Sequence, residues 1–119
     1  MATTVNTETL RRLALEVGED TVTVLLTVFS DELSQYHSQL AGSPSIEQIR
    51  EISHAIKSSA ASFGADDLAE MARECESRVR QGQREWMSHH LGELTEMLQG
   101  TASTYREMAV EQDFINSLT

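Results

Sequence analysis

The chain has few of the features that mark secreted and membrane proteins. Its 119 residues include one cysteine, one proline and six glycines. Cys75 has no second cysteine with which to form an internal disulfide, which favours a reducing compartment. No run approaches the ~18–20 apolar residues of a membrane span, and the first twenty residues lack the basic and apolar regions of a signal peptide. We therefore expect a cytoplasmic protein that does not enter a membrane.

Basic residues are also scarce. The formal net charge is −10, from 19 acidic and 9 basic residues, and Lys57 is the only lysine. A surface this acidic repels phosphate backbones and anionic lipids. We therefore expect neither nucleic acid nor a membrane as a partner, and we expect proteins with a complementary surface instead.

Helical periodicity runs along the whole chain, whereas no stretch alternates as a β-strand would. Glycines at helix-sized spacing suit C-terminal caps at positions 18, 42, 64 and 82. Ser45, with Gln48 three residues later, resembles a capping box that begins a helix. The expected helices cover about 7–17, 20–41, 46–63, 66–81 and 84–108. The sequence therefore predicts an all-α fold, an antiparallel up-down four-helix bundle with an additional short N-terminal helix.

The segment EISHAIKSSAASFG, residues 51–64, places a histidine on a helix of small and apolar residues. On a helical wheel His54 lies about 140° from the centre of the apolar stripe, so we expect it to face solvent. Lys57 follows one turn later, at the edge of the same face. Ser58 and Ala61 are small, which leaves room for a bulky partner to reach the imidazole. Most exposed helical histidines are ordinary solvated residues, and only this combination favours a function.

His54 and Lys57 are residue types suited to phosphoryl transfer. An unperturbed imidazole is mostly deprotonated at neutral pH and is then a nucleophile, while an ammonium can bind a phosphoryl oxygen as a point charge. The sequence has no glycine-rich phosphate loop and no acidic cluster suited to Mg²⁺ and ATP. A phosphoryl group would therefore have to arrive from another protein.

The stretch HAIKSSAASFGADDLA resembles the signature of histidine-phosphotransfer (HPt) domains. That signature consists of a histidine, a lysine, small residues, an apolar residue, a glycine and a leucine, matched here by His54, Lys57, Phe63, Gly64 and Leu68. Two positions depart from it, because Ile56 replaces a leucine and Ser58 replaces the usual glycine. The resemblance covers most of the chain, extends to the single-domain phosphorelay proteins of bacterial quorum sensing, and implies one HPt domain over residues 1–119.

This resemblance implies a function. His54 would accept a phosphoryl group from a receiver-domain aspartate of a hybrid sensor kinase and pass it to the receiver of a response regulator. The chain would be a monomeric, stoichiometric carrier without ATP-dependent kinase activity, with no cofactor of its own, because Mg²⁺ belongs to the receivers. Lys57 would steady phosphoryl oxygens, and Gly64 would end the helix. The partner-docking residues would be Glu47, Arg50, Glu51, Ser58 and Ala61.

Three interpretations other than phosphotransfer remain: a metal site, an adaptor and a kinase fragment. Glu51 and His54 have the Glu-x-x-His spacing of di-iron bundles, but no second copy exists and the wheel turns His54 outward, so we expect no metal. His89 and His90 point about 100° apart on a helix and are poor partners for one ion. The bundle could instead be an adaptor that is never phosphorylated, or a fragment of a dimeric kinase, although no ATP-binding half is present.

Overall fold

The computed structural model describes residues 4–119, so residues 1–3, at the start of the predicted domain, lie outside the described residues. Within that range the chain forms helices and no strands, which confirms the all-α prediction. The helices are α1 Thr7–Val17, α2 Glu19–Ala41, α3 Ile46–Ser62, α4 Asp66–Arg80, α5 Arg84–Val110 and α6 Gln112–Ser117. The bundle measures 45 × 22 × 22 Å.

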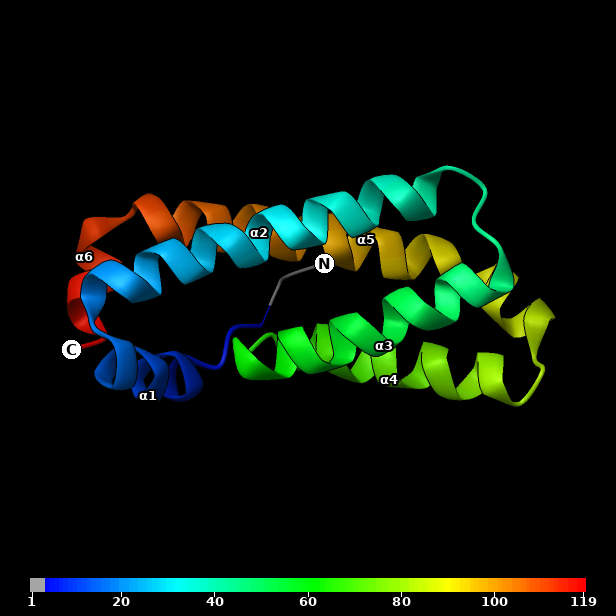
Figure 1. Cartoon of the computed structure of the whole chain (residues 1–119), viewed down its shortest axis with the longest axis horizontal. Coiled ribbons are helices and arrows are strands. Elements are labelled where there is room, and N and C mark those ends of the chain that lie inside the picture. Colours follow the sequence, from blue (N-terminus) through cyan, green and yellow to red (C-terminus); the bar gives the residue numbers. More distant parts are fainter. Residues whose placement is uncertain (1–3) are drawn as a thin grey trace.

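The four long helices run alternately up and down along the bundle (Figure 1). α2 packs mainly on α5, α3 packs mainly on α4, and the contact between α4 and α5 joins the two pairs. α1 packs against α2 and lies beside the turn that joins α3 to α4 (Figure 1). This arrangement confirms the predicted four-helix bundle with an additional N-terminal helix.

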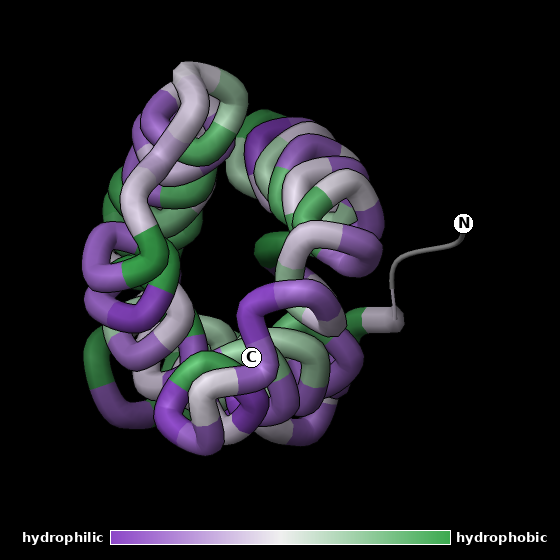
Figure 2. Tube along the Cα trace, turned by 90° about the vertical axis from the view of Figure 1, so that its right-hand side faces the viewer, coloured by the Kyte–Doolittle hydropathy of each residue, from purple (hydrophilic) through white to green (hydrophobic). Residues whose placement is uncertain are grey.

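The core follows the predicted periodicity, with one shift of register. Seen along the bundle, hydrophobic and hydrophilic residues are interspersed along the turns of the helices (Figure 2). In α2 the fully buried residues include Val22, Leu26, Phe29 and Leu33, at steps of four, three and four. The sequence also allows Leu25 on this stripe, but Leu25 is half-buried and Leu26 takes the core position. Both positions satisfy a 3–4 pattern, and only the packing partners distinguish them.

Local capping signals place the helix boundaries. The Ser45 side chain accepts a hydrogen bond from the Gln48 backbone N–H at 3.1 Å, as the capping box predicts, and α3 begins at the next residue. Gly42 ends α2, because its N–H donates to the Gln39 carbonyl at 3.4 Å, but its φ of −100° is not left-handed. Ser43, with a φ of +59°, takes the left-handed conformation instead.

The short α6 was not predicted. Its six residues are too few for a helical periodicity to be recognised in the sequence. The helix begins where the Glu111 side chain accepts a hydrogen bond from the Asp113 N–H, and it buries Ile115, which is followed by the buried Leu118. These residues close the end of the bundle against α5 and α2.

An aromatic cluster fastens α3 to α2 and α5. The Phe29 ring stacks on the Phe63 ring at 4.5 Å and meets the Tyr105 ring edge-on at 4.9 Å. The Tyr105 hydroxyl is buried and donates a hydrogen bond to the Phe63 carbonyl at 2.6 Å. The cluster therefore fixes the end of α3, the helix that contains His54.

We expect Tyr105→Phe to destabilise the protein by about 1–2 kcal/mol, because the partly buried Phe63 carbonyl loses its donor while the ring stays in place. Urea unfolding followed by circular dichroism measures the difference. Tyr36→Phe is the control, because it removes the same atom from a less buried tyrosine on α2 and should cost less. Equal losses in the two variants would contradict a stabilising role for the Tyr105 hydrogen bond.

No helix within residues 4–119 combines the length and apolar character needed to cross a membrane.

Candidate functional site

His54 lies on the outer face of α3. Its side chain is 59% exposed, which confirms the orientation expected from the helical wheel. The neighbouring Ile52, Ser53 and Ile56 are buried, so the helix is held firmly on its inner face. The backbone that supports His54 is therefore fixed by the core, while the imidazole remains open to another molecule.

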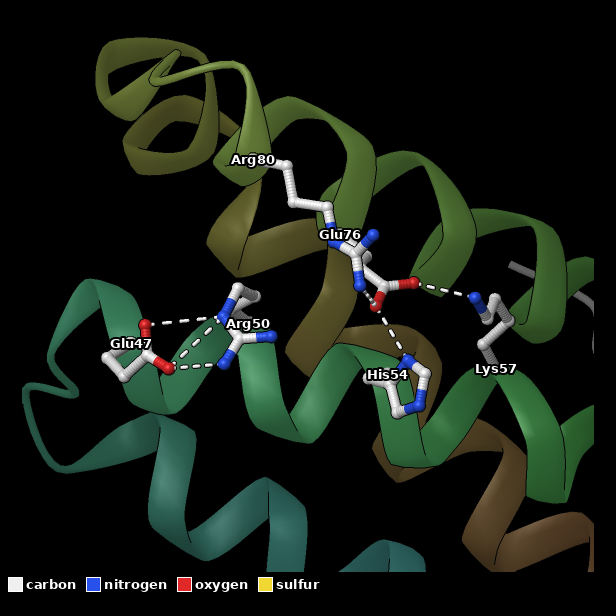
Figure 3. A network of polar contacts seen from close by, with 6 residues as sticks. All are labelled: Glu47, Arg50, His54, Lys57, Glu76 and Arg80. Atoms are coloured by element: carbon white, nitrogen blue, oxygen red, sulfur yellow. Dashed lines mark hydrogen bonds and ion pairs between the residues drawn. The ribbon is translucent and has the colours of Figure 1, made fainter.

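A buried carboxylate on α4 holds the imidazole. Glu76 has a side chain that is only 5% exposed, and its Oε2 lies 2.7 Å from His54 Nδ1 (Figure 3). Its Oε1 accepts a hydrogen bond from Lys57 Nζ at 2.7 Å, and its Oε2 also lies 3.1 Å from a guanidinium nitrogen of Arg80. One carboxylate thus links two residues of α3 with one of α4.

The cations keep Glu76 ionised. The hydrogen bond from Lys57 lowers the pKa of the Glu76 carboxyl, burial opposes this by raising it, and the hydrogen bond from His54 lowers it further. An ionised carboxylate accepts hydrogen bonds and donates none, so His54 Nδ1 must provide the hydrogen. In a neutral imidazole the other nitrogen, Nε2, then has a free lone pair, and it faces away from Glu76 (Figure 3).

This geometry can perform nucleophilic chemistry on an incoming electrophile. With the hydrogen on Nδ1, a neutral imidazole has a lone pair on Nε2, which faces away from Glu76, and this is the form in which an imidazole attacks (Figure 3). Lys57, 37% exposed and one turn away, has three donors and uses one of them on Glu76. Lys57 can therefore keep its contact with Glu76 and still offer hydrogen bonds to an anionic group near His54.

Glu76 was not among the residues predicted from the sequence. Leu68, Ala72 and Glu76 follow one another at intervals of four on α4, and all three are buried. A carboxylate on the apolar stripe of an amphipathic helix was the signal that could have revealed it, because buried acids require partners. Its partners lie 19 and 22 residues earlier in the chain, so the sequence alone did not bring them together.

The residues predicted to dock a partner occupy the same side of α3 but do not form one network. Glu47 and Arg50 form an ion pair with each other, next to the His54 site (Figure 3). The hydrogen bond from Arg50 lowers the pKa of the Glu47 carboxyl. Glu51, Ser58 and Ala61 are exposed.

The remaining signature residues lie in the core or at the turn between α3 and α4. Leu68 is buried, and Phe63 packs on Phe29. Gly64 has a φ of +74°, and a Cβ at this position would lie 2.6 Å from the Asn6 carbonyl oxygen. The Asn6 N–H donates to the Gly64 carbonyl at 2.8 Å, so the start of the N-terminal helix is joined to the α3–α4 turn. The contact with Asn6 was not predicted.

Other residues that the sequence analysis considered lie apart from this site. Cys75 is buried, and burial raises the pKa of its thiol to about 12, so it is not a thiolate. His89 is exposed on α5, whereas the His90 ring stacks on Trp86 at 3.9 Å and Nδ1 of His90 donates to the Trp86 carbonyl. Across the described part of the chain, no group of three or more His, Cys, Asp or Glu side chains is placed to hold a metal ion.

An exposed histidine on the flank of an antiparallel four-helix bundle, with a lysine one turn away, is the arrangement of a histidine phosphotransfer domain. The Hpt domain family model matches residues 24–104. Relatives named phosphorelay protein LuxU match most of the chain. The Vibrio cholerae protein is 37% identical over 87% of this chain and 95% of its own length, and the Vibrio harveyi protein is 38% identical over 85% and 91%.

A third relative, the LuxU of Vibrio vulnificus, is 42% identical over 65% of this chain and 70% of its own length. No solved structure matches the chain significantly. The chain therefore belongs to the Hpt domain family and, within it, to the LuxU phosphorelay proteins of quorum sensing. It is a histidine phosphotransfer protein. Members of this family are phosphorelay intermediates and form a class distinct from the ATP-dependent kinases.

Because Glu76 is ionised in the folded protein, the free energy of unfolding should depend on pH in the acid range. Because its pKa is lower in the folded chain than in the unfolded one, its ionised form stabilises the fold above its ordinary pKa, and this contribution is lost as the pH falls through the folded-state value. We expect the difference in unfolding free energy between wild type and Glu76→Gln to shift in favour of the variant as the pH falls below about 4. Urea titrations at several pH values test this, and a constant difference down to about pH 2 would contradict it.

Proposed function

We propose that His54 is the phosphoacceptor of a quorum-sensing phosphorelay. It takes a phosphoryl group from the aspartyl phosphate of a hybrid sensor kinase's receiver domain and passes it to the receiver of a LuxO-like response regulator. The observation that supports this most directly is the imidazole itself, which is exposed and held through Nδ1 so that Nε2 is free. Membership of the Hpt family agrees with it.

The transfer is a displacement at phosphorus. The Nε2 lone pair forms the N–P bond, the bond between phosphorus and the aspartyl oxygen breaks, and its electron pair returns to the aspartate carboxylate. No proton has to move, because His54 Nδ1 keeps its hydrogen and the phosphorylated ring becomes positively charged. The same step in reverse, on the second receiver, restores the neutral imidazole, so net flow can run in either direction.

Lys57 is the proposed phosphoryl-stabilising residue. Its ammonium group lies one helical turn from His54 and is held in place by Glu76 at 2.7 Å. A fixed cation near the three phosphoryl oxygens stabilises the charge that they share during transfer. The Mg²⁺ needed for the aspartyl phosphate is supplied by the partner receiver domain, and this chain adds no cofactor of its own.

The exposed face of α3 is the proposed docking surface for receivers. Ser58 and Ala61 are small and exposed, which allows another protein to approach the imidazole closely. The ion pair between Glu47 and Arg50, together with Glu51, forms the rim of this surface. The chain acts as a cytoplasmic monomer and as a stoichiometric carrier without kinase activity.

A transfer assay tests the proposal. The protein is mixed with a receiver domain that has a labelled aspartyl phosphate and Mg²⁺, and the labelled residue is identified by mass spectrometry. We expect label on His54 that is acid-labile and base-stable. Binding to the receiver without any label, in protein shown to be folded, would refute the carrier function and favour the adaptor interpretation.

A further inference from the structure

We propose that a groove between α4 and α5 is a binding site for small organic cations that combine an ammonium group with an apolar body. The groove has a volume of about 510 Å³, which lies within the range of small-molecule sites. It lies between the start of α4 and the middle of α5, and its residues are separate from those of the His54 site. The inference therefore does not depend on the proposed phosphoacceptor function.

Part of the lining of the groove is apolar. Ala65 and Leu68 line it from the start of α4, and Met97 lines it from α5. The unbranched side chain of a methionine adapts to the shape of the group that it contacts. An alkyl chain bound against these residues leaves water, which favours binding.

The charged residues of the lining are all acidic. Asp67 and Glu96 line the groove, and among the described residues no arginine, lysine or histidine does so. The positive end of the α4 dipole offsets about half a unit of charge near Asp67, so two carboxylates still leave the groove negative. The net charge of −10 adds to this field. The groove therefore favours a cation over a neutral or anionic ligand with the same apolar body.

Neutral polar groups add further acceptors. Thr101 is only 3% exposed and yet lines the groove, together with Gln99 and Ser103. A primary ammonium group has three donors, so it can meet a carboxylate and a hydroxyl or amide oxygen at the same time. Gly100 lies among these residues and has no side chain, which leaves space for a ligand.

The groove and His54 lie on opposite sides of α4. Asp67 is nine residues from Glu76, the partner of His54, and nine residues correspond to about 900° of helical rotation, two full turns and a half. The surface around His54 therefore stays open to a receiver when the groove is filled. A ligand in the groove would contact both α4 and α5, the helices whose packing joins the two pairs of the bundle, so it should stabilise the fold.

Three probes with the same six-carbon chain test this proposal: hexylammonium, hexanol and hexanoate. Each is titrated into the full chain labelled with nitrogen-15, and the NMR shifts of the backbone amides give the location and the dissociation constant. We expect saturable shifts at Leu68 and Met97 with hexylammonium, and binding about tenfold tighter than that of hexanoate. The melting temperature should rise in the same order.

Substitutions in the lining separate the contribution of charge from that of the apolar surface. Asp67→Asn and Glu96→Gln should each weaken the binding of hexylammonium by about two- to fivefold, the effect of one exposed charge pair, and leave the binding of hexanol unchanged. Glu93→Gln is the matched control, because Glu93 is an exposed acid on α5 that does not line the groove. It should bind hexylammonium as wild type does, and circular dichroism confirms that each variant is folded.

Several results would overturn the proposal. One is the absence of saturable shifts at the groove, and another is equal affinity for the three probes, since charge would then not be recognised. Equal losses in Asp67→Asn, Glu96→Gln and Glu93→Gln would also contradict it. The competing occupant is residues 1–3 of the chain itself, which precede Thr4 at the edge of the groove. If hexylammonium binds only after Ala2 and Thr3 are deleted, the groove holds this segment and the proposal is wrong.

Discussion

Replacing His54 by glutamine should abolish phosphoryl transfer to the protein and leave the helical bundle folded. Glutamine has no nucleophilic nitrogen, so no N–P bond can form. The fold should tolerate the change because the His54 side chain is 59% exposed, and because Glu76 keeps its hydrogen bonds with Lys57 and Arg80. We expect the free energy of unfolding to change by less than about 1 kcal/mol.

The matched control for this variant is His89→Gln. His89 is exposed, as His54 is, but it lies on α5, where its Nε2 is 4.0 Å from a carboxylate oxygen of Glu85. This variant should accept label as fast as wild type. Label that persists on folded His54→Gln would show that another residue is the acceptor, and loss of label in both variants would show that the effect is not specific to His54.

Gly64→Ala should produce the largest loss of stability among the single substitutions considered. The residue has a φ of +74°, which costs an alanine about 1 kcal/mol. The added Cβ would also lie 2.6 Å from the Asn6 carbonyl oxygen, which is backbone and cannot move aside alone. Displacing Asn6 breaks the 2.8 Å hydrogen bond from its N–H to the Gly64 carbonyl. We expect a total of about 2–4 kcal/mol, measured by urea unfolding.

Gly82→Ala separates the two causes of this loss. Gly82 has a φ of +76°, almost the same as Gly64, but a Cβ added there would have no neighbour within 4 Å among the described residues. It should therefore lose only the backbone contribution of about 1 kcal/mol. Hydrogen exchange should also show faster opening of α1 in Gly64→Ala alone. If the two variants lose equal stability, the contact between Asn6 and Gly64 does not hold the N-terminal helix.

Local signals in the sequence account for most of the helix boundaries. Ser45 accepts from the Gln48 N–H and begins α3, and Gly64 and Gly82 take the left-handed conformation after α3 and α4. These features depend on residues within four positions of one another, which is why they could be predicted. The short α6 depends instead on burying Ile115 and Leu118 against other helices, and no periodic pattern in the sequence indicates it.

The candidate site likewise has features that the sequence predicts and features that depend on tertiary packing. The sequence by itself determined that His54 faces outward on α3 with Lys57 one turn away, because a helix of known period fixes the angle between its side chains. The assignments of these residues to phosphoryl transfer and to docking stay predictions that the transfer assay tests. Only the tertiary structure decided that Glu76 would meet both side chains and that Asn6 would meet Gly64. Each of these contacts joins separate helices or turns, and their distances depend on how the whole core packs rather than on the spacing of residues along the chain.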